Sequence, residues 1–94
     1  MSQQFKLEII SPEKIIYSSE PTEVVIPSYE GYMTILHDHS ALVTFLRPGV
    51  IEVKGNETKK FFIEEGTVEF SDNKMLILTN TTIYIKQINK ENIY

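Results

Sequence analysis

The sequence predicts an all-β fold, a small antiparallel β-sandwich or flattened barrel built from about 8–10 short strands. Apolar and polar residues alternate with a period of two in many short segments, which is typical of strands with one buried face. Turn-forming residues interrupt these segments about every 8–12 residues or less, as they do in sandwiches and barrels. No apolar stripe with a helical period occurs before residue 86, so we expect no helix longer than a turn or two there.

In the first half of the chain, prolines and a glycine separate the expected strands. These strands cover residues 5–9, 14–18, 23–26, 32–35 and 41–46. Pro12 ends the first of them, because proline lacks the N–H that a sheet ladder needs and fixes φ. Pro21 and Pro27 bracket the third strand, and Gly31 opens the fourth. The pattern therefore predicts a series of short strands rather than a few long ones.

In the second half, short turns divide the chain in the same way. The expected strands cover residues 50–53, 58–63, 67–70, 75–78 and 83–85. In the turn at residues 47–49, Pro48 suits the first corner and Gly49 can adopt a positive φ. Residues 55–57 suit a hairpin turn, and residues 71–73 suit another. Residues 58–63 are therefore expected to be the return strand of a hairpin with residues 50–53.

The chain has 94 residues, which is the size of one small domain. We predict a β-sandwich domain over residues 1–86 and a short C-terminal tail over residues 87–94. Asn89 suits the N-cap of a helix. The tail is nevertheless shorter than the roughly 12–15 residues that an isolated helix needs for stability.

Composition excludes several classes of function. The formal net charge of −4 argues against nucleic-acid binding, which needs a basic patch. The chain has no cysteine, so disulfides, thiolate nucleophiles and thiolate metal sites are absent. We find no signal or transit peptide and no apolar run near the roughly 20 residues of a membrane span. We therefore expect a soluble protein that is used in the compartment where it is made.

Two histidines flank an aspartate at residues 37–39, and the chain has no other histidine. In an extended segment, His37 and His39 would project to the same face, as paired imidazole ligands do. A metal site needs at least a third ligand, and no further histidine or cysteine supplies it. We therefore predict no metal site. A metal-dependent barrel enzyme that uses these two histidines is kept as the least favoured of three hypotheses for the function.

Catalytic motifs are also poorly supported. Ser40, Thr44 and Asp38 lie near the histidines, but proximity in sequence is not the geometry that activates a hydroxyl. The glycines stand apart, so no phosphate-binding loop is formed. We therefore predict no catalytic residue and no cofactor. His39 is then either a loop histidine bonded to the backbone or a polar anchor against another protein.

An ordered set of short motifs extends over nearly the whole chain. It comprises residues 5–13 (FKLEIISPE), Tyr17, Ser18, residues 24–27, Glu30, Gly31, Ile35, Leu36, His39, Leu42, Thr44, Leu46, Pro48, Gly49, Val50, Phe62, Gly66, Val68, Glu69 and Asn73. In these residues the chain resembles the N-terminal sandwich domain of the epsilon subunit of the F-type ATP synthase. The strongest part is similar to the family segment Gly-Ile-Leu-Pro-Gly-His-x-Pro-Leu-Leu-Thr-x-Leu-x-Pro-Gly-Val. Each motif is weak alone, and the ordered set at the family spacing carries the resemblance.

The resemblance implies a non-catalytic central-stalk subunit of a proton-translocating ATP synthase. Such a subunit clamps the gamma subunit to the c-ring and couples rotation to ATP synthesis. The positions that match gamma-facing residues are Ser11, His39 and Thr44, and those that match the c-ring-facing loop are Glu30, Gly31, Tyr32 and Met33. The implied location is the cytoplasmic face of the bacterial inner membrane, as a peripheral subunit without direct membrane insertion. The alternative is a free-standing β-sandwich module that presents Tyr29, Tyr32 and Met33 to another protein.

The sequence also departs from the family pattern. Thr34 and Asp38 replace glycines, so we expect the loop near His39 to follow a different path. The family's C-terminal pair of helices has no counterpart in these 94 residues. Residues 88–93 match the motif Ile/Leu-Asp-x-x-Arg-Ala only in part. Asn89 stands at the position of the Asp, and the Arg and Ala are replaced by Asn92 and Ile93. We therefore expect the chain not to act as the ATP-sensing brake of some family members.

Overall fold

The computed structural model describes residues 3–80 and 82–85, which form ten strands and no helix. The strands are β1 (Lys6–Ile10), β2 (Ile15–Ser19), β3 (Glu23–Ser28), β4 (Gly31–Leu36), β5 (Leu42–Leu46), β6 (Gly49–Lys54), β7 (Thr58–Ile63), β8 (Gly66–Ser71), β9 (Lys74–Leu78) and β10 (Thr82–Ile85). The predicted all-β class is confirmed. The expected tail, with its candidate N-cap and residues 88–93, lies outside the described residues.

Pro27 does not end the third strand as the sequence predicts. It lies buried inside β3, which continues to Ser28. The Pro27 carbonyl accepts a hydrogen bond from the Arg47 N–H at 3.0 Å. The N–H and C=O of one strand residue point to the same side, so the missing donor faces the corner where β5 gives way to β6. No ladder bond is lost there, and the proline is tolerated.

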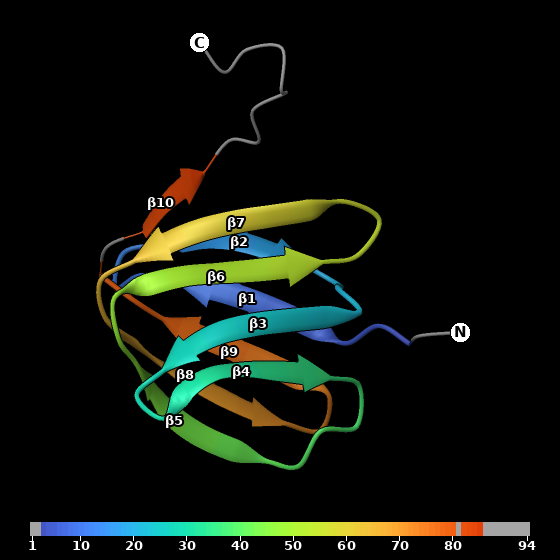
Figure 1. Ribbon diagram of the computed structural model, residues 1–94. Helices are drawn as coiled ribbons and strands as arrows, with labels where there is room; N and C mark the ends of the chain where they lie inside the picture. Colours follow the sequence, from blue (N-terminus) through green and yellow to red (C-terminus); the bar gives the residue numbers. More distant parts are fainter. Residues whose placement is uncertain (1–2, 81, 86–94) are drawn as a thin grey trace, which may run out of the picture.

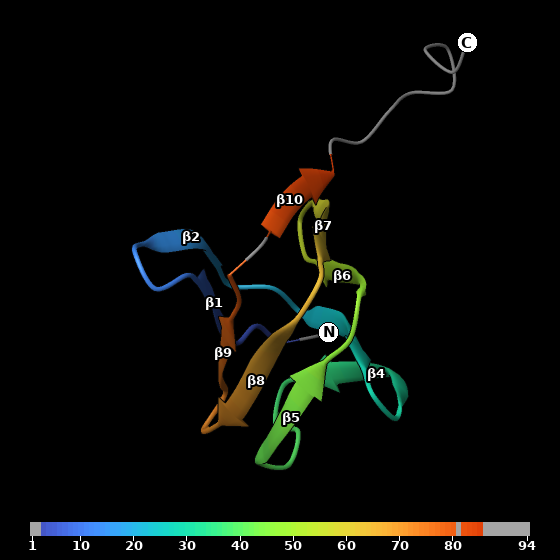
Figure 2. The ribbon, with the colours of Figure 1, turned by 90° about the vertical axis from the view of Figure 1, so that its left-hand side faces the viewer.

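The strands form one curled sheet that folds into two facing layers. Its order is β10-β7-β6-β3-β5-β8-β9-β1-β2, with β4 paired to β3. In Figures 1 and 2, β7, β6, β3 and β4 form one layer, and β2, β1, β9 and β8 form the other. All pairs are antiparallel except β1 and β9, which run parallel. The described strands therefore form a mixed sheet that is antiparallel apart from the β1–β9 pair.

Strand β3 links the two layers because it changes partners along one of its edges. It pairs with β6 through Glu23, Val24 and Val25. Its last residue, Ser28, then pairs with Leu46 of β5, which is the only register pair between β3 and β5 among the described residues. Strand β4 lines β3 along its whole length. The layers are therefore joined at this corner by very few backbone contacts.

The core lies between the two layers and is built from the inward positions of the alternating strands. Its buried apolar residues are Phe5, Leu7, Ile9, Val24, Ile26, Ile35, Leu46, Ile51, Val53, Phe61, Ile63, Val68, Phe70, Met75 and Ile77. Phe5 and Phe70 meet edge to face with ring centroids 5.5 Å apart. The buried hydroxyl of Thr79 donates to the Glu65 carbonyl at 2.6 Å, so this polar group is satisfied.

Candidate protein-binding site

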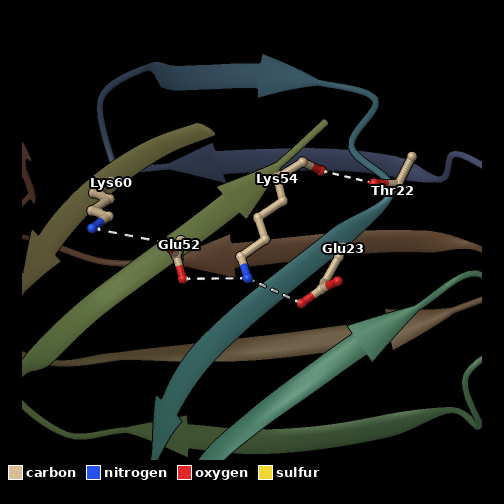
Figure 3. A network of polar contacts seen from close by, with 5 residues as sticks. All are labelled: Thr22, Glu23, Glu52, Lys54 and Lys60. Carbon is tan, nitrogen blue, oxygen red and sulfur yellow. Dashed lines mark hydrogen bonds and ion pairs between the residues drawn. The ribbon is translucent and has the colours of Figure 1, made fainter. Parts of the chain in front are cut away.

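The outer side of one layer carries a cluster of charged residues that pair with one another. Lys54 Nζ lies 3.5 Å from a Glu23 carboxylate oxygen and 3.8 Å from one of Glu52, and Lys60 Nζ lies 3.8 Å from the other Glu52 oxygen. The Thr22 hydroxyl donates to the Lys54 carbonyl at 3.2 Å. Figure 3 shows these side chains crossing β3, β6 and β7. We call Glu23, Glu52, Lys54 and Lys60 the charged face.

The outer side of the other layer carries a row of apolar residues. The strand registers connect Phe45 to Thr67, Thr67 to Leu78, Leu78 to Ile10 and Ile10 to Ile15. Val43 projects from β5 on the same side as Phe45. Phe45 is 63% exposed and Val43 is 72% exposed. We call Val43, Phe45, Leu78, Ile10 and Ile15 the apolar face.

Two carboxylates accompany the apolar face. Glu69 pairs in register with Val43 and with Leu76, and Leu76 pairs with Glu8. Within the described part of the chain, neither glutamate forms an ion pair. This face therefore combines exposed apolar side chains with unpaired negative charge, whereas the charged face neutralises its charges internally.

A pocket continues the apolar face around one end of the sandwich. Pro12, Tyr29, Phe45 and Leu78 contribute to its lining. Tyr29 is 70% exposed and belongs to the turn between β3 and β4. The apolar surface therefore extends from the middle of β5 to the β3–β4 turn. Exposed aromatic groups in continuous apolar surface are typical of protein-binding sites.

The structure does not bring Ser11, His39 and Thr44 together. Ser11 follows β1, at the end of the layer where Ile10 pairs with Leu78. His39 precedes β5 at the opposite end, beside the ring of Phe70 at a centroid distance of 6.0 Å. The Ser11 hydroxyl oxygen accepts from the Lys14 backbone N–H at 3.3 Å within its own turn. These side chains therefore occupy two ends of one layer rather than a single cluster.

Thr44 lies between those ends, on the inward side of β5. It is half-buried and shares its side with Leu42 and Leu46, whereas Val43 and Phe45 project outward. Sequence reasoning missed these two outward residues. The signal was present, because residues 42–46 are apolar on both alternating sides, and a half-buried strand needs an apolar residue on only one.

The loop containing the histidines is held by a reciprocal pair of hydrogen bonds. The Asp38 backbone N–H donates to the Asn73 side-chain oxygen at 2.6 Å, and the Asn73 amide donates to the Asp38 carboxylate at 2.9 Å. Asp38 has φ +66°, a conformation that favours glycine. Asp38 thus adopts a left-handed backbone without glycine, and Asn73 supports it.

Neither histidine is placed as a metal ligand. The positive φ of Asp38 bends the segment, so the extended geometry that would align His37 with His39 is absent. His39 Nδ1 lies 2.8 Å from the Ser40 carbonyl oxygen, which fits a loop histidine bonded to the backbone. His37 is half-buried and its Nδ1 lies 3.3 Å from Asp38. Residues 3–80 and 82–85 contain no group of three or more possible His, Cys, Asp or Glu ligands.

The residues expected to face the c-ring begin in the β3–β4 turn with Glu30 and continue into β4 with Gly31, Tyr32 and Met33. Glu30 is exposed, Gly31 has φ +119° and Tyr32 is 59% exposed. Met33 is half-buried and packs against the core, so its side chain points away from the tip. Tyr29 lies in the turn beside Glu30 and is more exposed than Tyr32 or Met33.

Comparison with known proteins identifies the family. The model of the ATP synthase delta/epsilon chain β-sandwich domain matches residues 4–85. The chain belongs to this family. An ATP synthase epsilon chain from Pelagibacter ubique is 45% identical over 96 residues, covering 99% of this chain and 73% of that relative. An epsilon chain from Brucella suis is 35% identical over 95 residues, covering 99% and 70%.

Solved structures of ATP synthase chains share the fold of this epsilon-chain homologue. A chain of the Euglena gracilis mitochondrial ATP synthase has a TM-score of 0.83 at 23% identity, and the match covers 97% of this chain and 59% of that one. A chain from the central stalk and c-ring of the Tetrahymena thermophila mitochondrial ATP synthase has a TM-score of 0.74 at 19% identity, covering 99% and 79%. The family resemblance is confirmed, and it is to a non-catalytic subunit.

The described residues contain no helix that could span a membrane.

Proposed function

We propose that this chain is a central-stalk subunit that clamps gamma to the c-ring of a proton-translocating ATP synthase and so couples rotation to ATP synthesis. The match of residues 4–85 to the epsilon-chain sandwich carries the proposal. The bacterial relatives support a peripheral position on the cytoplasmic face of the bacterial inner membrane. The chain itself performs no chemistry and uses no cofactor.

The apolar face is the surface that we assign to gamma. Phe45 and Val43 are exposed in the middle of a regular strand, where a solvated sheet face would carry polar residues. Ser11 and His39 lie toward the two ends of this layer, so they fit the rim of such an interface. Thr44 fits a supporting position behind Val43 and Phe45, because its side chain faces inward. Energetic anchors are typically aromatic and central, and rim contacts contribute less.

The β3–β4 turn is the surface that we assign to the c-ring. It projects Tyr29, Glu30 and Tyr32 from one end of the sandwich. The gamma surface lies along a layer, whereas this turn lies at an end, so one rigid domain can contact both partners. A clamp requires two such surfaces on a scaffold that does not deform.

The experiment is a binding measurement with purified gamma subunit from the same source. The parent chain is expected to form a stable complex, and Phe45→Ala is expected to weaken it by roughly 30-fold, equivalent to about 2 kcal/mol for a central aromatic anchor. Lys60→Ala, a matched change on the charged face, is expected to leave the affinity unchanged. A parent chain that is folded and does not bind gamma would refute the proposal and favour the free-standing module.

A further inference from the structure

Arg47, the single arginine of the sequence, connects the end of β5 to the β3–β4 turn. Its backbone N–H donates to the Pro27 carbonyl at 3.0 Å, and its Nε donates to the Ser28 carbonyl at 2.9 Å. Its guanidinium carbon lies 5.7 Å from the centroid of the Tyr32 ring. One residue thus contacts three positions of the β3–β4 hairpin.

The turn that Arg47 contacts has a well-defined shape of its own. The fully buried Ser28 hydroxyl donates to the Gly31 carbonyl at 2.7 Å and accepts from the Glu30 N–H at 3.2 Å. The Tyr32 hydroxyl lies beside Gly49, where an added Cβ would be only 3.1 Å from it. Tyr32 is therefore bounded by Arg47 and by the start of β6, although much of its ring remains exposed.

These contacts reinforce a corner that the backbone joins weakly. Ser28 and Leu46 form the only register pair between β3 and β5 in the described chain. Arg47 follows Leu46 directly and adds two hydrogen bonds across the same corner. Charged donors make stronger hydrogen bonds than neutral ones, and the planar guanidinium can donate in its plane while it stacks on a ring.

We propose that Arg47 is a positioning residue that fixes the β3–β4 turn relative to β5. This inference rests on the proposed function, in which the β3–β4 turn contacts the c-ring and the apolar face contacts gamma. Arg47 would hold these two surfaces in a fixed relative orientation. Arg47 then acts through the turn and makes no required contact with gamma. Without it, each surface remains intact and the mechanical connection between them loosens.

The test separates binding from coupling in the complete reconstituted complex. Arg47→Ala is expected to bind purified gamma within about twofold of the parent. ATP-driven proton pumping per ATP hydrolysed is expected to fall several-fold. Because the side-chain bond to the Ser28 carbonyl is lost, hydrogen exchange at the Glu30 amide and at the backbone amide of position 47 should accelerate by roughly tenfold, while exchange in β6 and β7 stays unchanged. Arg47→Lys, which keeps the charge and lacks the planar fork, should recover part of the coupling.

Matched controls make the outcomes distinct. Lys60→Ala removes a cation from the charged face and should change neither coupling nor exchange at the turn. Unchanged coupling and unchanged exchange in Arg47→Ala would overturn the inference. A loss of exchange protection throughout the domain, accompanied by a loss of gamma binding, would also overturn it, because Arg47 would then stabilise the whole fold. If Arg47→Ala does not fold, full coupling and parent-like exchange in Arg47→Lys would likewise overturn it. A parent chain that neither binds gamma nor supports coupling would refute the proposed function itself.

Discussion

The two outer faces of this sandwich are built on the same strand geometry and differ in chemistry. On the charged face, Lys54 lies between Glu23 and Glu52, and Lys60 reaches the second oxygen of Glu52. On the apolar face, Phe45 and Val43 are mostly exposed. Inward residues of both layers pack in one common core. The core is therefore built from the inward side of the strands, and the outward side differs in chemistry between the two layers.

The charged face contributes little to stability by itself, because exposed ion pairs are worth about 0–1 kcal/mol each. Its two glutamates and two lysines pair with one another, so the face carries no formal net charge. The exposed Phe45 and Val43 contribute less to the isolated fold than the buried core residues do, and they present apolar area that a partner can bury. The two faces are therefore expected to differ in what they contribute to stability and to binding.

The largest effect is expected behind the apolar face, where Phe70 packs against Phe5 and beside His39. Phe70→Ala should lower the free energy of unfolding by about 3–5 kcal/mol, because it leaves a cavity in the core. Urea denaturation measures this change. Phe45→Ala, the same substitution on the outer side, should change stability by about 0.5 kcal/mol or less. Equal losses in the two variants would contradict the assignment of inward and outward sides.

A smaller effect is expected at Gly66, which begins β8 beneath the apolar face. A Cβ added there would lie 2.5 Å from the Leu78 backbone oxygen, and backbone cannot move aside without disturbing the sheet. Gly66→Ala should destabilise the chain by about 1–3 kcal/mol. Gly55→Ala is the matched control in the β6–β7 turn, where the nearest atom is 3.5 Å away. Thermal unfolding of the pair should show a clear loss only for Gly66→Ala.

The hydrogen bonds between Asp38 and Asn73 give a third, more local test. Asn73 and its neighbour Asp72 both have positive φ, so a change to glycine is compatible with the backbone at either position. Asn73→Gly removes both hydrogen bonds to Asp38, and Asp72→Gly leaves them in place. Asn73→Gly should therefore be less stable than Asp72→Gly by about 1 kcal/mol in chemical denaturation. No difference would mean that the loop near His39 keeps its path without Asn73.

The smallest effect is expected on the charged face. Glu52→Gln removes the carboxylate that lies near both Lys54 and Lys60. The loss of stability should be below about 1 kcal/mol in low salt and should shrink further as ionic strength rises. Denaturation at several salt concentrations measures it. A large loss that does not respond to salt would show that this network supports the fold, and the contrast between the faces would fail.

The positions of the strands follow from the sequence, because alternation and turn chemistry are local. Every observed strand lies within two residues of a predicted range, and Pro12 and Gly31 mark turns as expected. The family and its non-catalytic character also followed from ordered motifs in the sequence. Of the residues predicted to contact the c-ring, Glu30 and Tyr32 are exposed and Gly31 and Met33 are half-buried, and the contact itself stays a prediction.

The way in which distant strands pair is visible only in the folded molecule. The parallel pairing of β1 with β9, the change of partner along β3 and the separation of Ser11 from His39 all depend on contacts between segments far apart in the chain. Residues 42–46 are apolar on both sides, so local pattern alone does not say which side meets the core. The packing of β5 against β8 turns Thr44 inward and Phe45 outward. Period-two alternation specifies that a strand has two sides, and the neighbouring strands select the one that is buried.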